Sequence, residues 1–275
     1  MKRIVLALAA AAVAAALAPA PAAAAVTVKG SDTMVILAQR WAETYMKKNA
    51  GKKVQVTGGG SGIGLAALQN GTTDIANASR GIKEDEIAKV RERFNVVPAE
   101  IAVAKDGLAV YVNESSPITQ LTMEQLKGIY LGDVTNWKQV GGADAPIVLY
   151  SRENSSGTYV FFKEHVLANG DFAPQAQTLP GTAAVVNAVA KEKNGIGYGG
   201  AAYAKGIKEV KIVGKDGQAY TPSNENVQSG KYPLSRSLFM YTRGKPSGET
   251  KDFIDYCLSK EGQGIVTQVG YFPIK

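Results

Sequence analysis

A repeated order of strand, small-residue turn and helix is the feature that most constrains how this chain can fold. After residue 25, short apolar segments are each followed by a turn of small and polar residues and then by a helical pattern. The predicted strands lie at 26–28, 54–56 and 74–77, and the turns after them at 30–33, 57–64 and 78–81. Strands that alternate with helices pack as a mostly parallel sheet covered by helices. The pattern therefore predicts an α/β fold.

A second series of elements follows the first. Strand candidates lie at 96–103, 108–112, 147–150, 210–213 and 238–241, and helices are expected at 121–131, 182–193, 249–258 and 262–269. The turn at 151–158 again precedes a helical pattern. No internal repeat of short, fixed period is visible. The two halves of the chain nevertheless share polar, small-residue turns placed directly before helices.

The composition excludes several classes of site. The 275 residues contain one cysteine, Cys257, and one histidine, His165. A disulfide framework and a thiolate zinc cluster both need several sulfurs, so we expect no metal site and no cofactor. Lysine and arginine number 31 against 24 acidic residues, but they are dispersed and form no basic stripe with interleaved aromatics. This distribution argues against nucleic acid as a partner and is compatible with a small anion.

The first 25 residues have the layout of a secretory signal. Lys2 and Arg3 precede an apolar run at 4–17, and small residues end the segment at 22–25. A membrane anchor is the alternative, but the apolar run is shorter than the ~20 residues that a spanning helix needs. We therefore predict export to the periplasm with cleavage near Ala25. Loss of these two basic residues lowers the formal net charge from +7 to +5.

Four of the turns bring hydroxyl groups to the start of a predicted helix. A helix start exposes about four unpaired N–H groups and the positive end of the helix dipole, which together attract anions. Any one such turn is better explained as an ordinary N-cap worth ~1 kcal/mol. Their repetition, the five glycines between 58 and 64, and two nearby arginines favour an anion site. The candidate residues are Ser31, Asp32, Thr33, Ser61, Ser79, Arg80, Arg152, Ser156, Gly157 and Thr158.

Enzyme motifs fit the sequence poorly. The glycine run does not match G-x-G-x-x-G, because Ile63 stands where the third glycine belongs, and no nucleotide phosphate-loop motif occurs. We interpret Cys257 as a buried, inert thiol and His165 as a surface or capping residue. A secreted phosphatase or hydrolase with Ser61 or Ser156 as nucleophile is the enzymatic alternative, but no histidine base or metal ligand set accompanies either serine. We predict a binding protein and not an enzyme.

Several motifs, in this order and spacing, resemble the periplasmic phosphate-binding proteins of phosphate-specific ABC transporters. The matching segments are 30–33, 41–45, 57–64, 74–80, 121–130 with Gly132 and Trp137, 155–158 and 195–198. The resemblance implies a two-lobed fold in which the chain crosses between the lobes twice. It also implies that dehydrated phosphate is held in the cleft between the lobes and that closure of the lobes delivers it to a membrane permease.

The resemblance assigns the phosphate contacts to Ser31, Asp32, Thr33, Ser61, Ser79, Arg152, Ser156, Gly157 and Thr158. One departure concerns specificity. The best-known members have a carboxylate where Ser79 stands, and it accepts a hydrogen bond from protonated phosphate, whereas this chain has Ser79 followed by Arg80. Asp32 or the Ser79 hydroxyl can supply that acceptor. Another oxyanion, such as sulfate, molybdate or tungstate, and a phosphate-sensing receptor therefore remain alternatives.

The resulting prediction is an α/β, type II periplasmic-binding-protein fold with the ligand between two lobes. The first lobe is expected at 26–108 plus 235–275 and the second at 109–234. Hinge crossings are expected near 108–112 and 235–241. The predicted partners are inorganic phosphate and the permease subunits of an ABC transporter, and the protein is expected to be a monomer.

Overall fold

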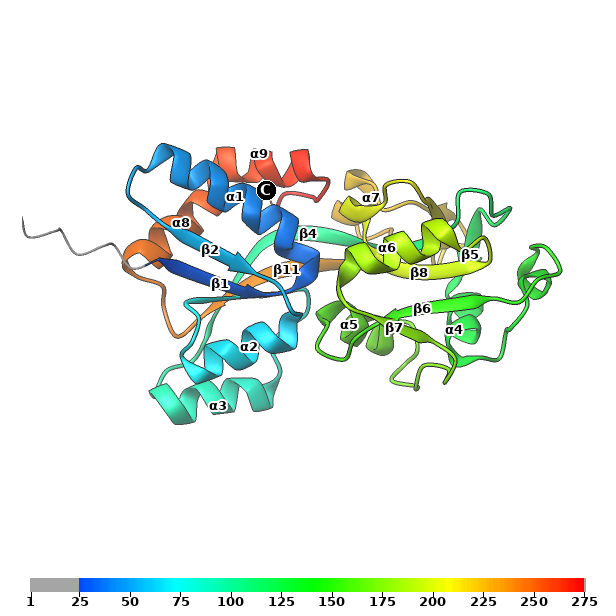
Figure 1. Cartoon of the computed structure of the whole chain (residues 1–275), viewed down its shortest axis with the longest axis horizontal. Helices are drawn as coiled ribbons and strands as arrows, with labels where there is room; N and C mark the ends of the chain where they lie inside the picture. Colours follow the sequence, from blue (N-terminus) through cyan, green and yellow to red (C-terminus); the bar gives the residue numbers. More distant parts are fainter. Residues whose placement is uncertain (1–24, 275) are drawn as a thin grey trace, which may run out of the picture.

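The computed structural model describes residues 25–274, and the predicted secretory signal lies outside these residues except for Ala25. The described chain forms two α/β bodies side by side, joined by extended strands (Figure 1). The predicted α/β class and the two-lobed arrangement are confirmed. Within residues 25–274, no helix is both long and apolar enough to cross a membrane.

The first lobe is built on a sheet with the strand order β2-β1-β3-β11. Its strands are β1 (Val26–Gly30), β2 (Val54–Thr57), β3 (Ile75–Ala78) and β11 (Ser235–Thr242). Its helices are α1 (Val35–Lys48), α2 (Ser61–Asn70), α3 (Glu84–Phe94), α8 (Gly248–Leu258) and α9 (Lys260–Val269), with a short 3-10 helix, η1 (Asp32–Met34). Strands β1, β2 and β3 are parallel, and β11 joins them antiparallel. Helices α1, α8 and α9 lie on one face of this sheet and α2 and α3 on the other (Figure 1).

The second lobe is built on strands that continue the same path. Its strands are β5 (Gln120–Thr122), β6 (Val148–Arg152), β7 (Gln177–Leu179), β8 (Gly195–Gly200), β9 (Lys208–Val213) and β10 (Ala219–Tyr220). Its helices are α4 (Met123–Leu131), α5 (Gly157–His165), α6 (Gly181–Lys191) and α7 (Asn224–Gln228), with 3-10 helices η2 (Trp137–Val140) and η3 (Ala201–Tyr203). Strands β8, β6 and β7 are parallel neighbours in that order. The turn at 151–158 leads from β6 into α5, as predicted.

A long strand, β4 (Ala99–Val112), runs from the first lobe into the second. Its first part, through Gly107, pairs with β11, and its second part, from Leu108, pairs with β8 and β9. The strand candidates at 96–103 and 108–112 are thus one continuous strand, which is a correction to the prediction. Asp106, between the two candidates, is paired across the sheet with Arg236 of β11, so a charged residue is accommodated there.

Each lobe has its own apolar core. Trp41 and Phe253 are fully buried in the first lobe, and Tyr130, Phe162 and Tyr198 form a cluster of aromatic rings in the second. Separate cores let the lobes behave as separate bodies, and the polar groups between them become available for binding.

The two residues considered for reactive chemistry have structural surroundings. Cys257 of α8 is fully buried in the first-lobe core, as predicted, and burial raises the pKa of its thiol. His165 ends α5, where its ring stacks on Phe161 and its Nδ1 lies 3.0 Å from the Phe161 carbonyl oxygen. Cys257 is therefore a core residue, whereas His165 is exposed, as predicted for a surface residue.

Candidate anion-binding site

In the first lobe, three serines meet at the carboxyl ends of neighbouring strands. Ser31 follows β1, Ser79 follows β3, and Ser61 begins α2 after β2. Because β1, β2 and β3 are parallel, these ends lie at one edge of the sheet. Ser31 Oγ donates to Ser79 Oγ at 3.0 Å, and the Ser79 N–H donates to Ser61 Oγ at 3.1 Å. The predicted convergence of these hydroxyls is therefore present, and all three are buried.

The second lobe contributes the start of α5. Ser156 is its N-cap, and the Ser156 hydroxyl accepts from the N–H groups of Thr158 and Tyr159 at 3.2 and 3.3 Å. Gly157 lies against the first-lobe serines, since a Cβ atom added there would be 2.3 Å from Ser61 Oγ. Only glycine fits this position, so the positive end of α5 comes close to the serine hydroxyls.

A pair of threonines joins the two lobes beside these groups. Thr33 Oγ1 of η1 and Thr158 Oγ1 of α5 are 2.8 Å apart, within hydrogen-bonding distance. Both side chains are buried. The helix starts of the two lobes therefore face each other, and their hydroxyl groups occupy the same small volume.

Arg152 connects the lobes by charge. Its side chain is 2% exposed, its Nη2 donates to Asp32 Oδ2 at 2.9 Å, and its Nη1 donates to Thr182 Oγ1 at 3.0 Å. The buried Nε has no partner among the described residues. Burial lowers the pKa of Arg152, and the Asp32 carboxylate opposes that shift. The other oxygen of Asp32 accepts from the Gly59 N–H at 2.8 Å.

The glycine run brings the backbone of the first lobe close to that of the second. The Gly62 N–H donates to the Ser155 carbonyl oxygen at 2.8 Å. A Cβ atom at Gly60, where φ is +96°, would lie 2.6 Å from the same oxygen. These glycines were expected to let the backbone approach an anion. In the structure, Gly60 and Gly62 let the two lobes approach each other.

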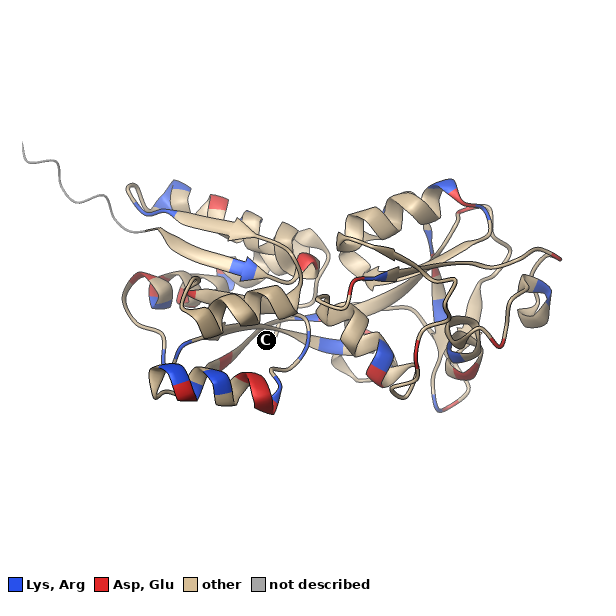
Figure 2. Ribbon diagram, turned by 60° about the horizontal axis from the view of Figure 1, so that its bottom comes forward, with Lys and Arg blue, Asp and Glu red and all other residues tan. Residues whose placement is uncertain are grey.

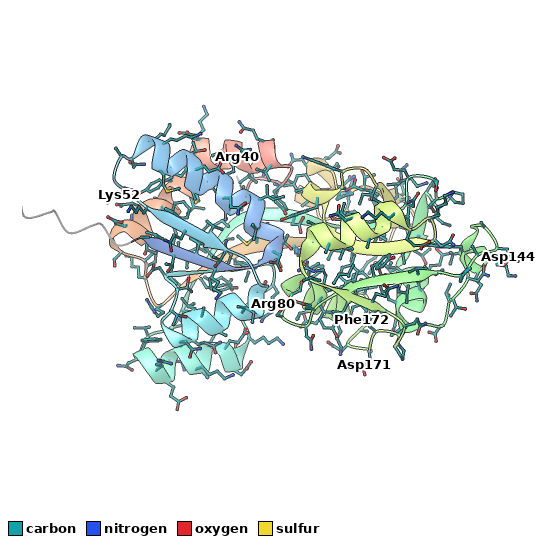
Figure 3. The ribbon with its side chains drawn as sticks, viewed as in Figure 1. Arg40, Lys52, Arg80, Asp144, Asp171 and Phe172 are labelled. Atoms are coloured by element: carbon teal, nitrogen blue, oxygen red, sulfur yellow. The ribbon has the colours of Figure 1, made fainter. Side chains whose placement is uncertain are left out.

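Arg80 is not brought together with the other candidates. Its Nη1 and Nη2 donate to the two carboxylate oxygens of Glu86 at 2.8 and 2.7 Å, and Nη1 also donates to the Gly81 carbonyl oxygen. Glu86 lies in the first turn of α3, so the guanidinium is held within the first lobe. Arg80 lies near the boundary between the lobes (Figure 3), but its hydrogen bonds point to the α3 side. These contacts occupy both terminal nitrogens of Arg80, and its buried Nε has no partner among the described residues. Its role in the anion site stays a prediction.

Two buried charged residues were missed by the sequence analysis. Arg236 of β11 donates through Nε and Nη2 to Asp106 Oδ2 of β4, at 3.0 and 2.7 Å. Nη2 also donates to Thr158 Oγ1 at 3.0 Å. The available signal was a charged residue two positions before each of two strand candidates, Asp106 before 108–112 and Arg236 before 238–241. The partnership itself was hidden, because the residues are far apart in the sequence and meet only when β4 and β11 pair.

The described residues give little support to the enzymatic and metal alternatives. Ser61 accepts from a backbone N–H, and Ser156 caps a helix, while His165 lies at the opposite end of α5 from Ser156. Within residues 25–274 no cluster of three histidine, cysteine, aspartate or glutamate side chains is arranged to hold a metal ion. The site is therefore an array of hydrogen-bond donors with two arginine–aspartate pairs.

Comparison with known proteins identifies relatives of this arrangement. Residues 15–261 match the family model described as a PBP superfamily domain. The phosphate-binding protein PstS of Pseudomonas aeruginosa is 36% identical over 263 residues, covering 89% of this chain and 81% of that protein. A Clostridium perfringens structure with bound phosphate is 31% identical, with a TM-score of 0.83 over 92% of this chain and 100% of that chain. An ABC-type phosphate transport receptor from Vibrio cholerae is also 31% identical, with a TM-score of 0.73 over 90% of this chain and 99% of that one. This chain therefore belongs to the PBP superfamily and, within it, to the PstS-like family of phosphate-binding proteins.

Proposed function

We propose that this protein binds inorganic phosphate between its lobes and delivers it to the permease subunits of an ABC transporter for uptake. It acts as a binding protein and not as an enzyme. Arg152 is the observation that carries the proposal, because this buried guanidinium of the second lobe pairs with Asp32 of the first and keeps one N–H unpaired among the described residues. The relatives named for phosphate binding or transport and the structure with bound phosphate support this choice of ligand.

The proposed ligand contacts come from both lobes. In the first lobe they are Ser31, Asp32, Thr33, Ser61 and Ser79, and in the second Arg152, Ser156, Gly157 and Thr158. Backbone N–H groups at helix starts and serine and threonine hydroxyls are already ordered, so phosphate exchanges water for preformed donors. Arg152 supplies a charge-assisted contact to the phosphate oxygens. Arg80 is left out of this set because Glu86 and Gly81 already occupy its terminal nitrogens.

Asp32 is the proposed acceptor for the phosphate proton. Each of its carboxylate oxygens takes one hydrogen bond, from Gly59 N–H and from Arg152, and retains a further lone pair. A fixed carboxylate accepts from protonated phosphate and repels fully ionised sulfate, because it has no proton to donate. Asp32 therefore favours protonated phosphate over sulfate more strongly than the Ser79 hydroxyl does.

Binding is proposed to close the two lobes about their connecting strands. The moving parts are 26–108 with 235–275 and 109–234, with hinge crossings near 108–112 and 235–241. The change of β4 partners between Gly107 and Leu108 supports a pivot at the first crossing. Closure of two lobes around a ligand is a familiar form of domain motion. The bonds from Asp32 to Arg152 and from Gly62 to Ser155 would then form as the lobes close.

The protein is proposed to work in the periplasm as a monomer, after removal of a signal peptide near Ala25. The basic, apolar and small-residue order of the first 25 residues supports export. Along the described chain, acidic and basic residues are interspersed in both lobes (Figure 2), which suits a freely diffusing binding protein. Cell fractionation with N-terminal sequencing and light scattering of the purified protein test the location, the cleavage position and the oligomeric state.

Calorimetry tests the choice of ligand. Protein unfolded to strip any co-purified ligand and then refolded is expected to bind one phosphate per chain. Sulfate, molybdate and tungstate, offered as competitors from pH 5 to 9, are expected to bind much more weakly. Asp32→Asn is expected to reduce the preference for phosphate over sulfate, because an amide can donate as well as accept. Equal binding of sulfate by the parent protein, or no heat with phosphate, would overturn the proposal.

A further inference from the structure

A buried charge pair lies where β4 leaves the first lobe. Arg236 and Asp106 face each other in the antiparallel register of β11 and β4, and their side chains are 3% and 0% exposed. Two nitrogens of the guanidinium, Nε and Nη2, donate to the same carboxylate oxygen. Asp106 directly precedes Gly107, the last residue of β4 that pairs with β11. The charge pair therefore lies beside the proposed pivot.

The same guanidinium also contacts both lobes. Nη1 donates to the Ser79 carbonyl oxygen at 3.2 Å, at the end of β3 in the first lobe. Nη2 donates to Thr158 Oγ1 at 3.0 Å, in the first turn of α5 in the second lobe. The Arg236 Cζ atom lies 5.3 Å from the centre of the Phe161 ring, also on α5. The Arg236 side chain thus links three parts of the molecule. They are the paired strands β4 and β11, the residue after β3 and the start of α5.

The bond from Arg236 sets the direction of the Thr158 hydroxyl. A threonine hydroxyl has one proton to donate and can accept through its oxygen lone pairs. Because Thr158 Oγ1 accepts from Arg236, its proton is directed toward Thr33 Oγ1, 2.8 Å away, or toward an anion beside both. Asp106 supplies the counter-charge that keeps the guanidinium in this position.

We propose that Arg236, held by Asp106, is a positioning residue that ties closure of the lobes to correct orientation of the anion site. The inference rests on the proposed binding of phosphate between the lobes. Arg236 does not have to contact phosphate in this role. It holds the Ser79 loop and the α5 start together in the closed form, and it orients Thr158 as a donor. Loss of this residue should therefore speed phosphate release more than it slows phosphate capture.

Arg236→Gln and Arg236→Lys test the proposal by stopped-flow kinetics with inorganic phosphate. Arg236→Gln loses the charge-assisted hydrogen bonds to Ser79 and Thr158, so it should raise the dissociation rate about tenfold or more. The association rate is expected to stay within about threefold of the parent value, since affinity changes within one interface arise mainly in dissociation. Arg236→Lys keeps the charge beside Asp106 but lacks the fork that reaches Ser79 and Thr158 together. It should preserve the melting temperature and still release phosphate faster.

Glu86→Gln is the matched control for Asp106→Asn, because both replace a buried carboxylate paired with arginine by its amide. Glu86→Gln should lower the melting temperature while keeping the parent dissociation rate and the phosphate-induced rise in melting temperature. Asp106→Asn should increase the dissociation rate and reduce that rise. If the parent binds phosphate and both Arg236 variants release it at the parent rate, this inference fails alone. If the parent does not bind phosphate, the proposed function fails and this inference fails with it.

Discussion

Two buried arginines near the lobe boundary have opposite kinds of partner. Arg80 is paired through two bonds with Glu86, six residues away on the same lobe. Arg152 is paired through one bond with Asp32, 120 residues away on the other lobe, and in both arginines the buried Nε has no partner among the described residues. The first pair lies within one lobe, whereas the second joins the two lobes. Burial of a charge therefore says less about binding than the position of its partner does.

The largest effect is expected from Arg152→Ala. Truncating one member of a buried, hydrogen-bonded charge pair costs about 2–5 kcal/mol, so the dissociation constant for phosphate should rise from roughly thirtyfold to several thousandfold. Calorimetry on ligand-stripped protein measures this change. Arg152→Lys should recover part of the loss, since it restores the charge without the fork. Parent-like affinity in Arg152→Ala would break the contrast between the two arginines.

Arg80→Gln tests whether the arginine that is paired within one lobe contributes to stability and not to phosphate binding. Breaking a buried ion pair leaves Glu86 uncompensated and costs about 3–5 kcal/mol of unfolding free energy, so the melting temperature should fall clearly. Phosphate affinity should stay within about twofold of the parent value, because the lost bonds lie within one lobe. Thermal unfolding and calorimetry on the same sample separate the two effects. A loss of affinity comparable to that of Arg152→Ala would return Arg80 to the anion site.

A smaller effect is expected from the glycine run, where two neighbours provide a built-in control. Gly59 and Gly60 both have positive φ angles, +111° and +96°, so alanine adds backbone strain at either position. A Cβ atom at Gly60 would also clash with the Ser155 backbone of the other lobe, whereas at Gly59 the nearest atom is 3.6 Å away. Gly60→Ala should therefore weaken phosphate binding about tenfold beyond Gly59→Ala, from an overlap cost of ~1–3 kcal/mol. Equal affinities of the two variants would show that the close approach of the lobes is unimportant for binding.

The smallest effect concerns a carboxylate whose pKa is set by burial. Burial raises the pKa of Glu209 on β9 to about 7, and the charge of Asp106 adds to the shift. The folded state thus binds this proton more tightly than the unfolded chain, where the pKa is about 4.3. Stability falls as the pH rises from about 4.3 to 7, and the penalty is complete above pH 7. Glu209→Gln should raise the melting temperature at pH 8 and give no gain at pH 4. A gain that does not change with pH would contradict the assignment.

The sequence was most informative where neighbouring residues determine the structure. Small residues and hydroxyls after apolar segments predicted the strand–turn–helix units, and the parallel strands then brought Ser31, Ser61 and Ser79 to one edge. The charge pairs were harder to predict because their geometry depends on tertiary contacts. Arg80 follows Ser79 directly, yet its guanidinium pairs with Glu86 of the next helix, α3, and not with another candidate residue. Asp106 and Arg236 become partners only through the register of β4 and β11.

The place of β11 in the first sheet has a consequence for the order of folding. It lies between β3 and β4, although it comes from beyond the whole second lobe in the chain. The elements of the second lobe are contiguous in sequence, so their contacts close shorter loops and can form early. The first-lobe sheet lacks the strand between β3 and β4 until residues 235–242 have been synthesised and paired. Arg236 arrives on that same strand, so the charge pair with Asp106 forms only as the domain is completed.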